Sequence, residues 1–132
     1  MTILKRGCDN GMSSQLANEL FEYGRTLCQM ERYSEAKEQL LLSEELEHLQ
    51  YTYYWLYRAC KGLGQEDEAL KYMTLCYNEN DMDKRCSMTY AEELAQHGKR
   101  REALKVLKKL MDIHGYDEYA DELMDDIKEK RI

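Results

Sequence analysis

Apolar side chains recur along most of the chain at intervals of three and four residues. Leu16, Leu20, Tyr23 and Leu27 show this spacing near the start of the sequence. Residues three and four apart lie on one face of an α-helix, because the helix has 3.6 residues per turn. The pattern therefore predicts an amphipathic helix over about residues 14–29.

A second stripe begins with Ala36 and Leu40 after a short break, so the two stripes together predict a helical hairpin. Ser34 is expected to cap the second helix, because its hydroxyl can accept a hydrogen bond from a free amide of the first turn. The same order of stripe, break and stripe returns twice. Measured from the alanine in YSEA, EDEA and RREA, the three copies are 33 and then 34 residues apart. This period is typical of a helical repeat array.

The stretch YTYYWLY, residues 51–57, favours a β-strand when it is considered alone, since tyrosine, tryptophan and threonine suit a pleated backbone. Composition argues against a strand. The 132 residues include no proline and seven glycines, and the residues that favour helices are abundant. We therefore expect an all-α protein without strands, in which the hairpins start with helices at about 14–29, 50–63 and 83–97.

These copies resemble the tetratricopeptide repeat (TPR), a helical hairpin of 34 residues, and the resemblance covers roughly residues 17–111. The first helices carry Gly24, Tyr57 and Ala91 at the family's small position, the turns carry Glu31, Gly64 and Gly98, and the second helices carry Ala36, Ala69 and Ala103. Tyr57 and Glu31 depart from the family's pattern, and no copy ends in its proline. The resemblance implies an α-solenoid of three hairpins, with repeats at about 17–49, 50–82 and 84–115.

The C-terminal segment carries a further apolar stripe after His114-Gly115. Its members are Tyr116, Tyr119, Ala120, Leu123 and Ile127. The stripe predicts a capping helix at about 117–131, which would cover the apolar side of the third repeat and bring the total to about seven helices. Residues 1–12 lack periodicity and are expected to form a flexible arm, so residues 13–132 would be a single domain.

The aromatic helix of the second repeat has two apolar faces. Tyr53, Leu56, Tyr57 and Cys60 are spaced for the core. A second face also carries aromatic side chains, and the resemblance implies that it lies on the concave surface of the repeats. With the matching positions of the other repeats, the predicted groove consists of Phe21, Arg25, Tyr51, Tyr54, Trp55, Arg58, Arg85 and Met88. Aromatic residues, methionine and arginine are enriched at the centres of protein interfaces.

The sequence therefore predicts a non-enzymatic interaction module, an adaptor or chaperone. Its partner would be a peptide or helix that combines apolar and acidic residues. One TPR subclass binds acidic chaperone tails with a clamp of Lys, Asn, Asn, Lys and Arg, but the matching positions here hold Phe21, Arg25, Trp55, Arg85 and Thr89. In architecture the chain is similar instead to small bacterial chaperones of secretion substrates. Other interpretations stay open: the aromatic residues pack against each other, the N-terminal arm or the capping helix covers them, or the patch is a homodimer surface in a larger assembly.

Charge and motifs argue against several other functions. The formal net charge of −7 disfavours nucleic acid and anionic membranes as partners. The block from Lys99 to Lys109 contains six basic residues and one acid, Glu102, so a second binding surface there stays open. The acidic segment from Asp117 to Asp126 follows it, and attraction between the two segments is the simpler interpretation.

No cofactor, metal or catalytic site is expected. The three histidines have no partner four residues away, the five cysteines form no CxxC pair, and the phosphate-binding and hydrolase motifs are absent. The chain begins without a secretory signal pattern and has no apolar run of the roughly 20 residues that cross a bilayer. We therefore expect a cytoplasmic protein with reduced cysteines.

Overall fold

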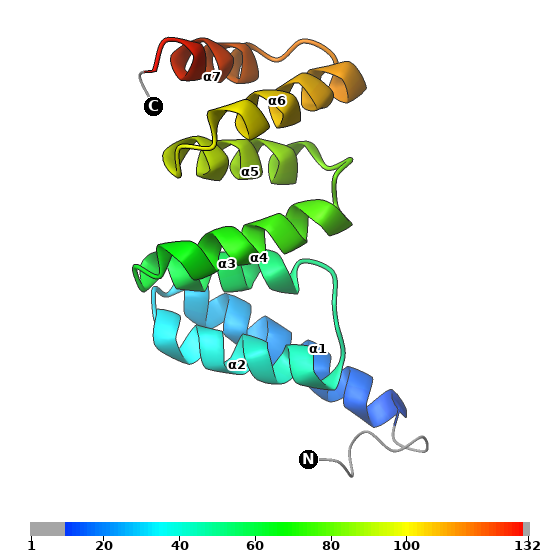
Figure 1. Cartoon of the computed structure of the whole chain (residues 1–132). Coiled ribbons are helices and arrows are strands. Elements are labelled where there is room, and N and C mark those ends of the chain that lie inside the picture. The colour runs from blue at the N-terminus through cyan, green and yellow to red at the C-terminus, as the bar shows by residue number, and fades with distance from the viewer. Residues whose placement is uncertain (1–9, 131–132) are drawn as a thin grey trace. The chain divides into compact units, whose positions relative to one another are not determined.

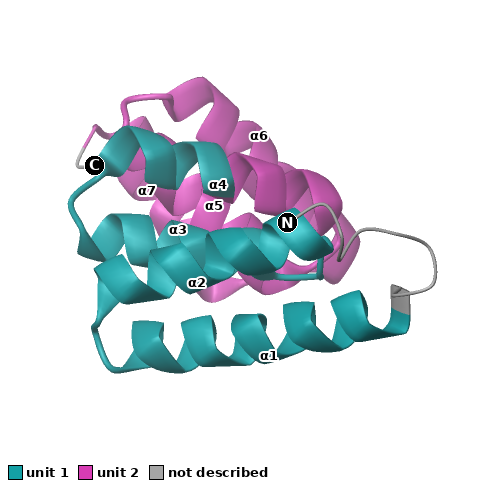
Figure 2. Cartoon of the chain, turned by 90° about the horizontal axis from the view of Figure 1, so that it is seen from below, with its two compact units in different colours: residues 1–72 teal, residues 73–132 magenta. Residues whose placement is uncertain are grey.

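The computed structural model describes residues 10–130, which form seven α-helices and no strand (Figure 1). The helices are α1 (Asn10–Gln29), α2 (Tyr33–Leu46), α3 (Thr52–Gly62), α4 (Glu66–Glu79), α5 (Lys84–Gln96), α6 (Arg100–His114) and α7 (Glu118–Lys128). The all-α prediction is confirmed, and the aromatic stretch is helical from Thr52 onward. Two compact units divide the chain, residues 1–72 and 73–132 (Figure 2).

Three helix-ending turns have the same backbone geometry. Glu31, Gly64 and Gly98 all have a left-handed φ, of 63°, 75° and 78°. In each turn the amide of this residue donates to the carbonyl three residues earlier, and the next amide donates to the carbonyl five residues earlier, at 2.8–3.1 Å. These bonds satisfy carbonyls at the end of a helix. Glu31 therefore adopts the glycine geometry although its side chain disfavours it.

In the first unit, α1 and α2 cross closely at Gly24. A Cβ on this residue would lie 2.6 Å from Cγ of Leu40 and 3.3 Å from the carbonyl oxygen of Ala36. The buried Ser43 hydroxyl donates to the carbonyl of Ala17 at 2.7 Å and ties α2 to α1. Lys37 on α2 reaches Glu68 on α4 at 3.0 Å, so the second hairpin is joined to the first by an ion pair as well as by packing.

In the second unit, α7 covers part of α5 and α6. Ala120, Leu123 and Ile127 are buried, as the predicted capping stripe requires, but Tyr116 and Tyr119 are exposed. The prediction that these two tyrosines belong to the buried stripe was wrong. Tyr116 precedes α7, and Tyr119 lies in its first turn. The hydroxyl of Tyr119 instead donates to the carboxylate of Glu92 on α5.

Aspartates cap two helices of the second unit. The Asp83 side chain accepts from the amide of Cys86 at 3.1 Å and starts α5. The Asp117 side chain accepts from the amide of Ala120 at 2.8 Å and starts α7. Asp117 also pairs with Lys84 of α5 at 2.6 Å, so the start of α7 is fixed to α5 by charge.

Helix starts differ from the prediction in the first unit. The helix α2 begins at Tyr33 after Arg32, with no side-chain cap, so the prediction that Ser34 caps it was wrong. The helix α1 begins at Asn10, so residues 10–12 belong to α1 rather than to the expected arm. The rest of that arm, residues 1–9, lies outside the described residues.

Candidate partner-binding site

The helix α3 carries three side chains that contact one another, Tyr54, Trp55 and Arg58, which we call the α3 cluster. The Tyr54 and Trp55 rings meet edge to face, with 5.3 Å between centroids. The Arg58 guanidinium lies 5.9 Å from the Tyr54 centroid and 5.4 Å from that of Trp55, within the range of cation–π attraction. Helical spacing brings these side chains together, because Arg58 follows Tyr54 by four residues and Trp55 by three.

Aromatic side chains position the guanidinium of Arg58. Its Nη1 atom donates to the Tyr54 hydroxyl at 3.2 Å. This hydrogen bond raises the pKa of Arg58 above its ordinary value, so the side chain is a permanent cation. Within residues 10–130 Arg58 forms no ion pair with a carboxylate. The exposed guanidinium is therefore oriented by the two rings.

Trp55 also belongs to the packing of the first unit. The indole is half-buried and packs, together with Tyr33, against a buried cluster of Leu27, Cys28, Ala36 and Ala59. This contact joins α3 to α1 and α2. Trp55 is thus partly a core residue, which differs from the prediction of a face separate from the core.

Phe21 and Arg25 lie on α1, which contacts α3. Both side chains are half-buried, and they follow each other at a spacing of four residues. Arg25 forms an ion pair with Glu22, while its buried Nε atom has no hydrogen-bond partner within the described chain.

The other predicted groove residues are placed differently. Tyr51 has a left-handed φ of 74° and precedes α3, so it is outside the helix whose spacing placed it beside Tyr54. Arg85 is exposed and Met88 is half-buried on α5, in the second unit. Within the predicted set, the side chains of Tyr54, Trp55 and Arg58 contact one another, and the Trp55 amide donates to the Tyr51 carbonyl at 3.2 Å.

Sequence reasoning missed the contact between Tyr33 and Gly62. A Cβ on Gly62 would overlap the Tyr33 ring, so the absence of a side chain at the end of α3 lets this ring lie against the helix. Tyr33 in turn packs against the same buried cluster as Trp55. The available signal was a glycine inside the predicted helix, where glycine is unfavourable without a packing reason.

Neither a protein-family model nor a curated protein matches the sequence. Solved structures do match. The first TPR of Spaghetti (RPAP3), bound to the HSP90 peptide SRMEEVD, superposes with a TM-score of 0.75 and 17% identity, over 89% of this chain and 94% of that one. The chain has the TPR fold.

Two further solved structures share the TPR fold of this chain. The Yersinia enterocolitica chaperone SycD, in complex with a peptide of the translocator YopD, gives a TM-score of 0.72 and 19% identity over 87% of this chain and 94% of that one. PcrH, in complex with the chaperone binding region of PopB, gives 0.65 and 16% over 86% and 92%. Within the TPR fold, α1, α3 and α5 are the first helices of the three hairpins.

Metal binding and membrane insertion were also considered possible functions of residues 10–130. No group of three or more histidine, cysteine, aspartate or glutamate side chains is arranged to hold a metal ion in this part of the chain. None of its helices has both the length and the apolar content needed to cross a bilayer.

Proposed function

We propose that this chain is a non-enzymatic protein-binding module, an adaptor or chaperone, and that a peptide or helix of a partner protein binds at the α3 cluster. Phe21 and Arg25 of α1 and Tyr51 extend this site within the first unit. Arg85 and Met88, on α5 of the second unit, are proposed separately as partner contacts. The partner segment combines apolar side chains with at least one acid.

The observation that carries this proposal is the state of Arg58. Its guanidinium is exposed, fixed against Tyr54 and Trp55, and without a carboxylate partner in the described residues. An arginine held in this way has lost part of its conformational freedom before binding, which reduces the entropic cost of pairing with an acid. The adjacent half-buried rings supply apolar contact area for a neighbouring side chain of the same segment.

The similar structures support this class of partner. RPAP3 is seen with an acidic HSP90 peptide, and SycD and PcrH are seen with segments of YopD and PopB. The chain lacks the clamp residues expected for acidic chaperone tails, with Trp55 at one clamp position. This difference favours a partner in which apolar side chains supply more of the binding energy than the acids do.

The test uses Trp55, the single tryptophan of the chain, as an intrinsic fluorescent reporter. A panel of amphipathic peptides that includes SRMEEVD is titrated, each beside a counterpart with amides in place of its acids. On the wild-type protein we expect acidic peptides to bind about tenfold tighter than their counterparts, a difference of roughly 1.4 kcal/mol that falls as salt is raised.

Arg58→Gln should remove this preference, because the side chain keeps much of its length but loses its charge. Arg101→Gln is the matched control, since it removes an exposed arginine on α6. Equal affinity for acidic and amide peptides on the wild-type protein, or the same loss in both variants, would contradict the proposal.

A second candidate function is self-association. Several large apolar side chains of the first unit are exposed, among them Met12 at 61%, Tyr23 at 51% and Leu42 at 46%. Exposed apolar side chains of this size can serve as contacts between two copies of a protein. Sedimentation over a wide concentration range separates the two functions, because a chain that stays monomeric at high concentration cannot be a homodimer module.

A further inference from the structure

Two buried cysteines face each other in the second unit. Cys76 on α4 is 0% exposed and Cys86 on α5 is 2% exposed. Their Sγ atoms are 3.5 Å apart and within hydrogen-bonding distance. Cys28 and Cys60 are equally buried, but neither contacts another thiol within residues 10–130. Among the four cysteines of the described chain, Cys76 and Cys86 thus face each other, while Cys28 and Cys60 are similarly buried.

The segment between the two cysteines is held by both adjoining helices. Asn80 donates from its side chain to the Cys76 carbonyl at 2.9 Å, and Asp83 accepts from the Cys86 amide. Each cysteine is therefore attached to a residue of the turn that connects α4 to α5. These bonds join the backbone of each cysteine to the turn.

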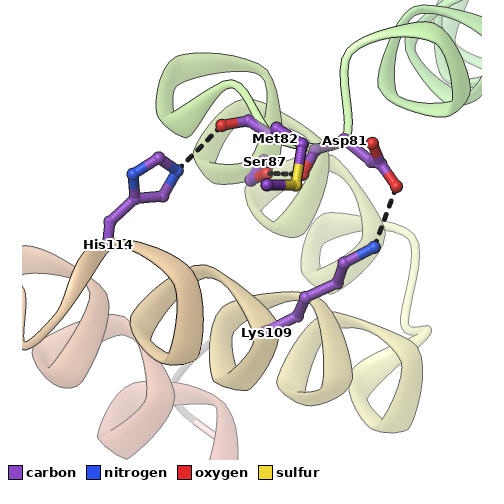
Figure 3. A network of polar contacts seen from close by, with 5 residues as sticks. All are labelled: Asp81, Met82, Ser87, Lys109 and His114. Atoms are coloured by element: carbon purple, nitrogen blue, oxygen red, sulfur yellow. Dashed lines mark hydrogen bonds and ion pairs between the residues drawn. The ribbon is translucent and has the colours of Figure 1, made fainter.

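Side chains of α6 also contact this turn (Figure 3). Nζ of Lys109 donates to the Asp81 carboxylate at 2.9 Å, and the Nε2 atom of His114 lies 2.9 Å from the Met82 carbonyl oxygen. Ser87 adds a long hydrogen bond to the Asp81 carbonyl at 3.5 Å. In Figure 3 the side chains of Lys109 and His114 reach from α6 toward Asp81 and Met82, so the turn that connects the two cysteine-bearing helices is held by a third helix of the same unit.

We propose that Cys76 and Cys86 form a reversible disulfide when the protein meets a small two-electron oxidant of the hydrogen peroxide class. A disulfide requires the sulfurs to approach to about 2.05 Å. From 3.5 Å this is a movement of roughly 1.5 Å, shared between two side chains.

The reaction is balanced by peroxide alone. The Cys86 thiolate attacks one peroxide oxygen, the O–O bond breaks, and Cys86 becomes a sulfenic acid while hydroxide leaves. The Cys76 sulfur then attacks the Cys86 sulfur, the S–O bond breaks and the S–S bond forms. The two thiol protons end in water, so two thiols are oxidised and one peroxide is reduced to two waters.

Electrostatics favour Cys86 as the first nucleophile. The hydrogen bond from the Cys76 thiol lowers the pKa of Cys86, while the same bond and burial raise the pKa of Cys76. Burial raises the pKa of Cys28 and of Cys60. Because the thiolate is the reactive form, Cys86 is the described cysteine most suited to react.

The experiment treats the folded wild-type protein with hydrogen peroxide, alkylates the remaining thiols after denaturation, and maps tryptic peptides by mass spectrometry without reduction. Trypsin separates the two cysteines into peptides 72–84 and 86–99, because Lys84 and Arg85 lie between them. We expect these two peptides to be linked, Cys28 and Cys60 to remain alkylated, and dithiothreitol to restore both thiols.

Two variants complete the test. Cys28→Ser should still form the 72–84 to 86–99 link, and Cys86→Ser should not. The oxidised wild-type protein should melt at least a few degrees above the reduced protein, because the link closes a loop in the unfolded chain. Cys76 and Cys86 alkylated to the same extent as Cys28 and Cys60, a link to another cysteine, or a lower melting temperature after oxidation would each overturn the proposal.

Discussion

Replacing Gly24 with alanine should destabilise the protein although alanine is the better helix former. Two effects oppose each other at this position. Alanine in a helix interior is favoured over glycine by about 1 kcal/mol. The added Cβ, however, would lie 2.6 Å from Cγ and 2.8 Å from Cδ2 of Leu40, which is fully buried, and 3.3 Å from a backbone oxygen of α2.

Leu40 cannot move aside without displacing other core atoms, and the Ala36 carbonyl is part of the α2 backbone. Overpacking of this kind typically costs about 1–3 kcal/mol. Because the close contacts include a branched carbon and backbone, we place Gly24→Ala in the upper half of that range. The net loss of unfolding free energy is then about 1–2 kcal/mol after the gain in helix propensity.

The assay is urea unfolding followed by the helical circular dichroism signal. Gly11→Ala is the matched control in the same helix, because a Cβ at Gly11 meets no atom within 4 Å. It should leave stability unchanged or raise it by a few tenths of a kcal/mol. If Gly24→Ala proves as stable as wild type while Gly11→Ala behaves as expected, α1 and α2 do not approach as closely as described, and the packing argument fails.

Three further predictions concern single side chains. Glu31→Gly should raise the unfolding free energy by about 1 kcal/mol, since Glu31 has a left-handed φ of 63° and forms the same turn as two glycines; a loss in urea unfolding would contradict this. Thr52→Val should stabilise by about 1 kcal/mol, because the buried Thr52 hydroxyl has no hydrogen-bond partner in the described chain; a destabilised variant would reveal a bound water or other partner. The ion pair with Lys84 and the bond from the Ala120 amide lower the pKa of Asp117, so its stabilisation is complete above the unfolded pKa of about 4 and is lost as pH falls through the lower folded pKa. The melting temperature of Asp117→Asn should therefore differ most from wild type at neutral pH and converge with it in acid; a constant difference would show that the ion pair is not the cause.

The periodic features of the chain could be predicted because each repeats. Ala36, Ala69 and Ala103 are all fully buried, as the 33- and 34-residue spacing requires. The turn position occupied by Gly64 and Gly98 was enough to locate the Glu31 turn. When the same pattern occurs in three copies, a position that is clear in two copies identifies the matching position in the third.

Local exceptions could not be predicted in the same way. Apolar spacing locates the face of a helix but not its first residue, so the cap expected at Ser34 was wrong and the aspartate caps of α5 and α7 were missed. The left-handed backbone of Tyr51 could not be predicted from its residue type. Because of this backbone conformation, Tyr51 lies outside α3 and not at the helical position expected from the spacing. These features depend on where neighbouring helices end rather than on periodicity.

Trp55 shows why core and binding faces cannot be fully separated by spacing on α3. Consecutive positions on a helix differ by about 100°, so two stripes assigned to different faces leave side chains at the border between them. An indole is large enough to cover that border, and Trp55 contacts both the buried cluster and Arg58. Truncation of Trp55 would therefore remove packing and binding surface together, and a loss of affinity could not be assigned to either. Arg58 is exposed and its guanidinium lies against the Tyr54 and Trp55 rings, so its charge can be removed with little change in the core. The site is thus best tested through the arginine, while the tryptophan beneath it, left in place, reports the binding.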